Sequence, residues 1–100
     1  MDLTVIILNF NVRYLLESCL ESVFTATASI PSEVIVVDNA STDESVAMVQ
    51  TRFPQVMLLT NTENLGFAKA NNQAIRRAKG RKILILKKMK NPMKEYLSHR

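Results

Sequence analysis

Short runs of apolar residues alternate along the chain with longer segments in which apolar residues recur at helical spacing. The short runs have the length of β-strands, and they are Leu3–Leu8, Val34–Val37, Val56–Leu59 and Ile83–Leu86. Continuous apolar runs of this kind are typical of strands that are covered on both faces of a parallel sheet. The pattern therefore predicts four mainly parallel strands.

Three amphipathic segments lie between these runs, at residues 12–23, 41–53 and 67–79. Ser41 with Glu44 three residues later forms a capping-box pattern, so we expect the second helix to start at Ser41. Gly80 is the expected C-terminal stop of the third helix. Strands that alternate with helices in this way predict an α/β fold with right-handed crossovers and helices on both faces of the sheet.

The composition is that of one small globular domain, with 47% hydrophobic and 22% charged residues in a chain of 100. Cys19 is the only cysteine, which excludes an internal disulfide and fits a reducing compartment. It lies on the apolar stripe of the first helix, so we expect it in the core. Neither a signal peptide nor a run of about 20 apolar residues is visible, and we expect a cytoplasmic location.

Charge is distributed unevenly along the chain. Residues 1–63 carry two basic and eight acidic groups, a net charge of −6, whereas residues 64–100 carry eleven basic groups and one acid, a net charge of +10. The amphipathic pattern ends after Leu86, so we interpret residues 87–100 as an aberrant basic tail on a domain of residues 1–86. An alternative interpretation makes residues 64–100 a module that binds nucleic acid or an anionic membrane.

Polar residues follow three of the predicted strands, in the segments 9–11, 38–43 and 61–71. Open α/β sheets bind ligands at the carboxyl ends of their strands, where Asp38 ends a covered strand. The first of these turns has no glycine, which excludes a dinucleotide fingerprint and a P-loop. A phospho-receiver site is disfavoured because the first strand does not end in acids. The amides, hydroxyls and aromatic ring of the three segments suit a nucleotide base and its ribose.

Four segments in order resemble the family 2 glycosyltransferases, which are inverting enzymes of the GT-A fold. They are Val5–Asn11, Leu16–Val23, Val36–Asp43, and Asn64–Phe67 with Ala70-Asn71. The resemblance covers about residues 2–86. It implies the nucleotide-sugar-binding half of a three-layer, Rossmann-like GT-A domain, with three crossover helices and the strand order 3-2-1-4.

The resemblance also implies which residues bind a nucleotide-diphosphate-sugar donor, namely Leu8, Phe10, Asp38, Asn39, Gly66 and Asn71. Asp38 would accept a hydrogen bond from the base, while Leu8 and Phe10 would line the base and ribose pocket. Asp43 would hold its loop. Simpler interpretations stay open, since Asp38 could cap a turn, Phe10 could pack over a helix, and Gly66 could serve a positive φ.

The family also uses a divalent metal, Mg or Mn, held by an Asp-containing motif after the fourth strand. Here Met93 stands where an Asn-Pro-Asp motif would end, and no Asp follows Asp43. We therefore assign no metal ligand and no catalytic residue, His99 included, and expect a truncated chain that does not transfer sugar alone. The open edge of the fourth strand predicts self-association. We expect no nucleic-acid partner, and the basic half is compatible with peripheral membrane contact.

Overall fold

The structure is a computed structural model that describes residues 1–86. The predicted basic tail, the metal-motif position at Met93 and His99 lie outside the described residues. The elements follow one another in strict alternation: β1 (Leu3–Asn9), α1 (Arg13–Ala26), β2 (Ser32–Asn39), α2 (Ser45–Arg52), β3 (Met57–Asn61), α3 (Gly66–Arg77) and β4 (Lys82–Leu86).

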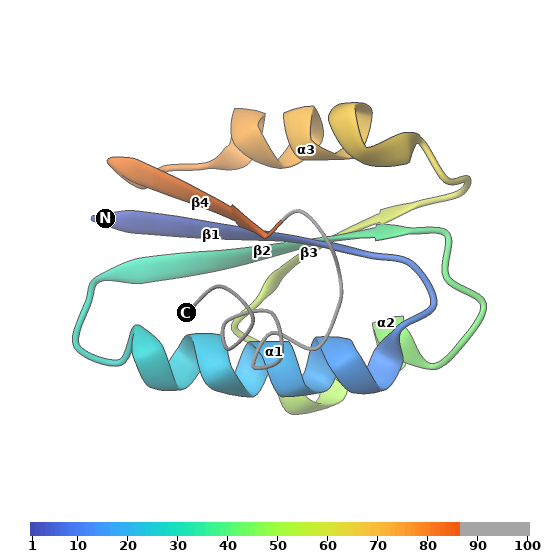
Figure 1. The fold of residues 1–100 in the computed structure, drawn as a ribbon, viewed down its shortest axis with the longest axis horizontal. Helices are drawn as coiled ribbons and strands as arrows, with labels where there is room; N and C mark the ends of the chain where they lie inside the picture. The colour runs from blue at the N-terminus through green and yellow to red at the C-terminus, as the bar shows by residue number, and fades with distance from the viewer. Residues whose placement is uncertain (87–100) are drawn as a thin grey trace, which may run out of the picture.

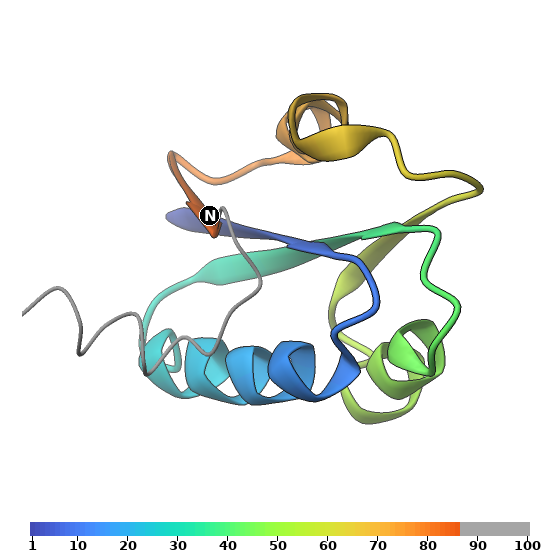
Figure 2. The ribbon, with the colours of Figure 1, turned by 45° about the vertical axis from the view of Figure 1, so that its right-hand side comes forward.

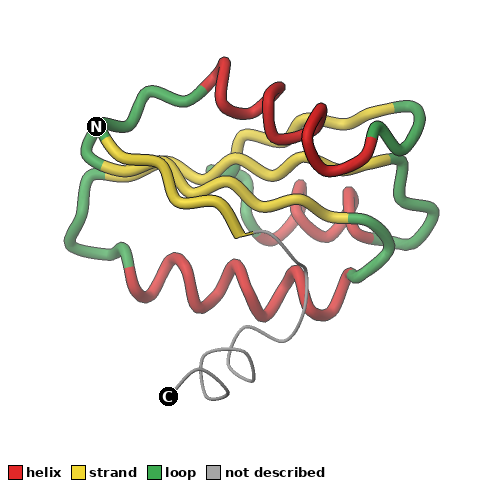
Figure 3. Tube along the Cα trace, turned by 45° about the horizontal axis from the view of Figure 1, so that its top comes forward, coloured by secondary structure: helices red, strands yellow, loops and turns green. Residues whose placement is uncertain are grey.

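The four strands form one parallel sheet in the order β3-β2-β1-β4, which confirms the predicted order. Helices α1 and α2 lie on one face of this sheet, and α3 covers the other face (Figures 1 and 2). The predicted three-layer α/β arrangement is therefore confirmed. Because the strands are parallel, their carboxyl ends meet at a single edge, and the loops that lead into all three helices leave from it (Figure 3).

The core is centred on β1 and β2, whose apolar side chains are buried on both faces of the sheet. On the α1 and α2 face they pack against Leu16, Cys19 and Leu20 of α1. Burial raises the pKa of the Cys19 thiol to about 11, which agrees with its predicted place in the core. On the opposite face α3 contributes Ala70 and Ala74, whose small side chains let the helix lie close to the sheet.

Gly80 serves a purpose other than the predicted one. Helix α3 ends at Arg77, three residues earlier, so the prediction of Gly80 as its C-terminal stop is wrong. A Cβ on Gly80 would lie 2.4 Å from the backbone nitrogen of Thr4, and the Gly80 N–H donates a hydrogen bond of 2.9 Å to Thr4 Oγ1. Glycine is needed here because the connection from α3 to β4 crosses β1 in direct contact.

The outer strand β4 is the least covered part of the sheet. In the described part of the chain it pairs with β1 and with no other strand. Ile83 and Leu84, which point to opposite faces, are 43% and 48% exposed. A parallel strand is normally covered on both faces, so β4 leaves apolar surface open.

Within residues 1–86, no helix combines the length and the apolar character that crossing a bilayer requires.

Candidate functional site

A pocket of about 330 Å³ opens at the carboxyl edge of the sheet, between the ends of β1 and β2 and the start of α3. Its wall combines apolar, aromatic and amide groups: Leu8, Asn9, Phe10, Val12, Asn39, Asn64, Gly66 and Phe67. Four of the six predicted site residues, Leu8, Phe10, Asn39 and Gly66, are thus brought together. Asp38 and Asn71 do not line this pocket.

The pocket wall offers two exposed aromatic rings. Phe10 and Phe67 are 47% and 44% exposed, so their faces are available to a flat ligand. Gly66 has a φ of +79°, and a Cβ built on it would meet no atom within 4 Å. The predicted positive φ is confirmed, and it is the backbone conformation rather than a lack of space that favours glycine at this position. The Asn64 Oδ1 atom accepts a hydrogen bond of 2.8 Å from the Gly66 N–H and fixes this turn.

Asp38 lies behind the pocket and is 2% exposed. Its Oδ1 atom accepts hydrogen bonds from Asn9 Nδ2 at 2.8 Å and from Ser41 Oγ at 2.7 Å. Its Oδ2 atom accepts a third from the Ser41 backbone N–H at 2.9 Å. These bonds tie the ends of β1 and β2 to the loop that follows β2. Asp38 therefore makes the contacts with the following turn that its interpretation as a turn cap predicts.

The loops after β1 and β2 are held together by a second set of polar contacts. The Asn11 N–H donates to Ser41 Oγ at 2.9 Å, and the Thr42 N–H donates to Asn11 Oδ1 at 2.7 Å. Asn11 and Ala40 have φ values of 52° and 64°. Asn tolerates this left-handed conformation, whereas for Ala it is uncommon, so the contacts around Ala40 must hold it in place. The edge beside the pocket is therefore stiff.

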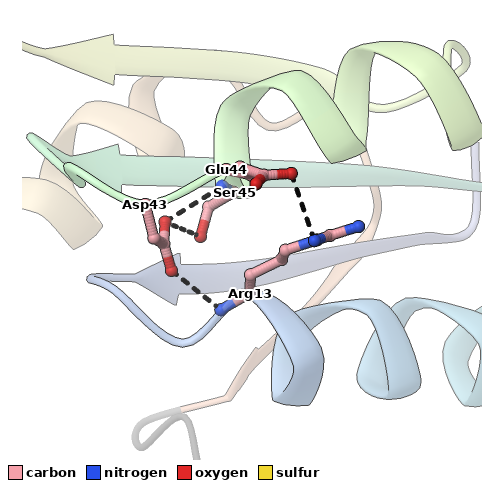
Figure 4. A network of polar contacts seen from close by, with 4 residues as sticks. All are labelled: Arg13, Asp43, Glu44 and Ser45. Carbon is pink, nitrogen blue, oxygen red and sulfur yellow. Dashed lines mark hydrogen bonds and ion pairs between the residues drawn. The ribbon is translucent and has the colours of Figure 1, made fainter.

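Asp43 caps two helices at once (Figure 4). Its Oδ1 atom accepts hydrogen bonds from the Ser45 N–H at 2.9 Å and from Ser45 Oγ at 2.5 Å, at the start of α2. Its Oδ2 atom accepts one from the Arg13 N–H at 3.1 Å, at the start of α1. An ion pair of 3.2 Å between Arg13 and Glu44 lies beside these bonds. The prediction that Asp43 holds its loop agrees with this geometry.

The predicted capping box is wrong. Helix α2 begins at Ser45, and Glu44 makes no side-chain cap hydrogen bond. The Ser41 hydroxyl is instead used by Asp38 and Asn11. Ser41 therefore makes tertiary contacts and does not cap the helix. The charged carboxylate of Asp43 accepts the hydrogen bonds at the start of α2.

The Asp43 carboxyl group has a lowered pKa. Its limited burial acts to raise the pKa, but the hydrogen bonds from Ser45 and from the backbone N–H of Arg13 favour the ionised form and outweigh that effect. Asp43 is therefore a carboxylate at neutral pH. It faces a second pocket, of about 500 Å³, between the starts of α1 and α2.

Asn71 is buried on the inner face of α3, with 6% of its surface exposed, while Asn72 is exposed. The Asn71 Oδ1 atom has no hydrogen-bond partner within residues 1–86. A buried acceptor without a donor is costly, so Asn71 lacks a hydrogen bond that such a group normally makes.

The described residues do not fit a divalent metal. No group of three or more His, Cys, Asp or Glu side chains within residues 1–86 could hold one. The pocket wall offers amides and aromatic rings, whereas Mg²⁺ and Mn²⁺ prefer carboxylate oxygens. The chemistry of the pocket wall suits an organic ligand better than a metal ion.

Sequence reasoning missed four wall residues, Asn9, Val12, Asn64 and Phe67. Asn9 pairs with Asp38 in the register of β1 and β2, and no pattern in the sequence gives that register. Phe67 was predicted to be the first residue of a helix; it is the second residue of α3, and this first turn places it in the pocket wall. The one available signal was that all four lie within the three polar segments or next to them.

The model of the family described as Glycosyl transferase family 2 matches residues 4–86. The chain therefore belongs to the family 2 glycosyltransferases, and the predicted resemblance is confirmed. A comparison with curated proteins found no match.

Several solved structures are similar to this chain. The chain is similar to S. aureus TarS 1-349 with a TM-score of 0.74 and 27% identity, over 86% of this chain and 27% of that one. It is similar to the mannosyltransferase PcManGT from Pyrobaculum calidifontis, in complex with GDP-Man and Mn²⁺, with a TM-score of 0.65 and 34% identity, over 77% of this chain and 24% of that one.

The complex of S. aureus TarS 1-349 with UDP shares the fold, with a TM-score of 0.77 and 23% identity, over 99% of this chain and 31% of that one. The chain thus spans 24–31% of the length of these structures.

Proposed function

We propose that residues 1–86 form the nucleotide-sugar-binding half of a glycosyltransferase, which transfers a sugar from a nucleotide-sugar donor to a glycan, lipid or polysaccharide acceptor. The observation that carries the proposal is the pocket at the carboxyl edge, whose wall has two exposed aromatic rings and three amides. This is the edge at which parallel α/β sheets bind nucleotides. Family membership supports this function over the basic nucleic-acid-binding module.

Each wall residue has a proposed role in binding the nucleotide. Phe10 stacks on the base, and Leu8 gives the base an apolar floor. Asn39 and the Gly66 backbone supply polar contacts, and Gly66 lets the chain approach the ligand closely. Asn71 acts one layer behind, where it shapes the start of α3.

Asp38 is proposed to recognise the base as well as to hold the loop. A carboxylate has about four acceptor positions, of which three are occupied by Asn9 and Ser41, so one position on Oδ2 is left for a base N–H. The surrounding hydrogen bonds fix the direction of this position. Recognition by Asp38 therefore depends on Asn9 and Ser41 staying in place.

The donor is proposed to be a nucleoside-diphosphate sugar. Solved relatives contain UDP or GDP-Man with Mn²⁺, so UDP and GDP-mannose are the first donors to test. We propose that residues 1–86 alone bind the nucleotide without transferring sugar, because their pocket offers no metal-binding carboxylates and no general base. A family metal would have to be held by groups other than the pocket wall.

Titration of the purified chain with UDP and GDP-mannose, followed by NMR and calorimetry, tests the proposed function. We expect weak binding that shifts the resonances of Leu8, Phe10 and Gly66, and that Asp38→Ala abolishes. Glu63→Ala, which removes an exposed acid near the same edge, is the matched control and should bind as wild type does. Absence of binding at millimolar nucleotide, or sugar turnover by the purified chain in a radiolabelled assay, would contradict the proposal.

We also propose that the chain self-associates through β4. Within residues 1–86 the outer edge of the strand has no pairing partner, and Ile83 and Leu84 expose apolar surface on both faces. An edge of this kind is a template for pairing with a second copy. Light scattering should detect dimers that Leu84→Lys disperses, and monomers alone at high concentration would contradict the idea.

Peripheral membrane contact is proposed for the basic surface that α3 and β4 share. Six exposed cations lie between residues 64 and 86, where no acid occurs: Lys69, Arg76, Arg77, Lys79, Arg81 and Lys82. Such a surface attracts anionic lipids by charge. Binding to vesicles of anionic lipid should fall with salt, and equal binding to neutral vesicles would exclude this contact.

A further inference from the structure

Three amide side chains connect the pocket wall to the outer side of α3, and we call them the amide relay: Asn39, Asn61 and Gln73. Asn61 Nδ2 donates hydrogen bonds of 2.9 Å to Asn39 Oδ1 and to Gln73 Oε1. Gln73 Nε2 returns a hydrogen bond of 2.9 Å to Asn61 Oδ1. Of the three residues, only Asn39 lines the nucleotide pocket, while the other two line a separate polar pocket beside α3.

Two backbone groups decide which way the Asn39 amide faces. The Leu65 N–H donates to Asn39 Oδ1 at 3.5 Å, and Asn39 Nδ2 donates to the Gly66 carbonyl oxygen at 3.5 Å. A backbone N–H can only donate and a carbonyl can only accept, so both contacts favour the same orientation. Asn61 adds a shorter bond from its Nδ2 atom to the same Oδ1. The Asn39 oxygen therefore faces the relay and its nitrogen faces Gly66, which lines the pocket.

We propose that Asn39 is a specificity-determining residue that presents a hydrogen-bond donor to the ligand, and that Asn61 and Gln73 are positioning residues that hold it in this orientation. The proposal rests on the proposed function. The ligand atom opposite Asn39 must then be an acceptor, such as a carbonyl oxygen of the base or an oxygen of the ribose or phosphate. A donor group at that point is disfavoured.

Burial makes this orientation of the Asn39 amide hard to change. Asn39 is 5% exposed, so its amide cannot turn freely toward water to suit a different ligand. The Nδ2 atom carries two hydrogens, and in the described part of the chain its one protein acceptor is the Gly66 oxygen at the upper limit of hydrogen-bond length. An acceptor atom of the ligand would take a hydrogen bond from the second hydrogen of Asn39 Nδ2. Sites that hydrogen-bond a ligand in this way discriminate strongly against analogues that cannot reciprocate.

Binding of UDP by variants of the relay, measured by NMR titration, tests the inference. Asn39→Asp keeps the shape of the side chain but can only accept hydrogen bonds when ionised, and we expect affinity for UDP to fall by about tenfold or more. Gln73→Ala lies outside the nucleotide pocket and should weaken binding by about threefold to tenfold, since Asn61 loses a partner. Asn72→Ala, an exposed neighbour on α3, is the matched control and should bind UDP as wild type does.

A conservative variant separates orientation from packing. Gln73→Glu keeps the bulk of the side chain and still accepts a bond from Asn61, but the ionised group donates none to Asn61 Oδ1, so UDP affinity should fall by less than in Gln73→Ala. Thermal unfolding of each variant shows that the fold is intact. The side-chain NH₂ resonances of Asn39 should shift on addition of UDP to wild type, and less in Gln73→Glu.

The outcomes distinguish this inference from the proposed function. If wild type binds neither UDP nor GDP-mannose, both are overturned. If wild type binds UDP and the folded Asn39→Asp or Gln73→Glu variants bind it equally well, the relay inference alone is overturned. A loss of affinity in these variants, with Asn72→Ala unchanged, supports it.

Discussion

The two faces of the sheet hold the carboxyl edge with different chemistry. On the face covered by α1 and α2, the buried Asp38 carboxylate accepts three hydrogen bonds of 2.7–2.9 Å. On the α3 face, the neutral amide of Asn39 contacts the loop backbone of Leu65 and Gly66 at 3.5 Å. Bonds to a charged acceptor are shorter and stronger than bonds between neutral groups.

This difference suggests a division of work between the faces. The α1 and α2 face has the larger apolar core and a carboxylate that accepts three hydrogen bonds, so it holds the edge of the sheet firmly. The α3 face has alanines, long hydrogen bonds and an uncovered outer strand, so its stability is expected to be lower. Four substitutions test this comparison.

Leu20→Ala should have the largest effect. Leu20 is fully buried in the core between α1 and the sheet. Removing its side chain leaves a cavity, and we expect the free energy of unfolding to fall by about 2–5 kcal/mol. Urea unfolding followed by circular dichroism measures the change. A loss no larger than that of an exposed apolar residue would show that this face does not carry the core.

Asp38→Asn should have the second largest effect on stability. The variant keeps the size of the side chain but loses the charge, and an NH₂ group then replaces one of the two acceptor oxygens. A buried donor from Asn9 or Ser41 is left unpaired, at a cost of about 1–3 kcal/mol. Urea unfolding again gives the value, with Glu63→Gln as the control for an exposed acid. If the two variants are equally stable, the hydrogen-bonded Asp38 carboxylate does not stabilise the edge.

Asp43→Asn should have a smaller, pH-dependent effect. The folded pKa of Asp43 lies below that of the unfolded chain, so its stabilising contribution is present above the unfolded pKa and is lost as pH falls through the folded pKa. At pH 7 we expect the variant to be less stable by about 1 kcal/mol, as for the loss of a helix cap. Below the folded pKa the two proteins should converge. A constant difference in unfolding free energy from pH 7 to pH 2 would disprove the assignment.

Ile83→Ala should have the smallest effect. Ile83 points to the α3 face from the outer strand and is 43% exposed, so only part of its side chain is buried. We expect a change of less than about 1 kcal/mol, a fraction of the effect at Leu20, since burial of apolar area sets the scale. The same urea experiment compares the two. A cost equal to that of Leu20→Ala would mean that β4 is as well covered as the centre of the sheet, against the division proposed above.

Much of the fold could be predicted from the sequence because the strands are covered on both faces. A run such as Val34–Val37 has no polar alternation, and four such runs separated by helical spacing leave few arrangements that obey the right-handed crossover rule. Element ends were less certain. Ser41 and Gly80 carried local signals for a helix start and a helix stop, and tertiary contacts with Asp38 and Thr4 used them otherwise.

The site could be predicted in part, for a related reason. The ends of parallel strands meet at one edge, so polar residues after each strand were bound to gather there, and Leu8, Phe10, Asn39 and Gly66 do. Whether Asp38 faces the ligand or the loop could not be predicted, because that depends on the register between β1 and β2.

The sequence by itself determined the order and type of the elements, the parallel sheet and the edge at which a ligand would bind, because these follow from local apolar patterns. Only the tertiary structure decided which polar side chains meet. Asn9 reaches Asp38 across 29 positions of the chain, and Asn61 reaches Asn39 across 22, through strand pairing alone. Hydrogen bonds act over about 3 Å, so their partners are set by the final packing and not by the local sequence.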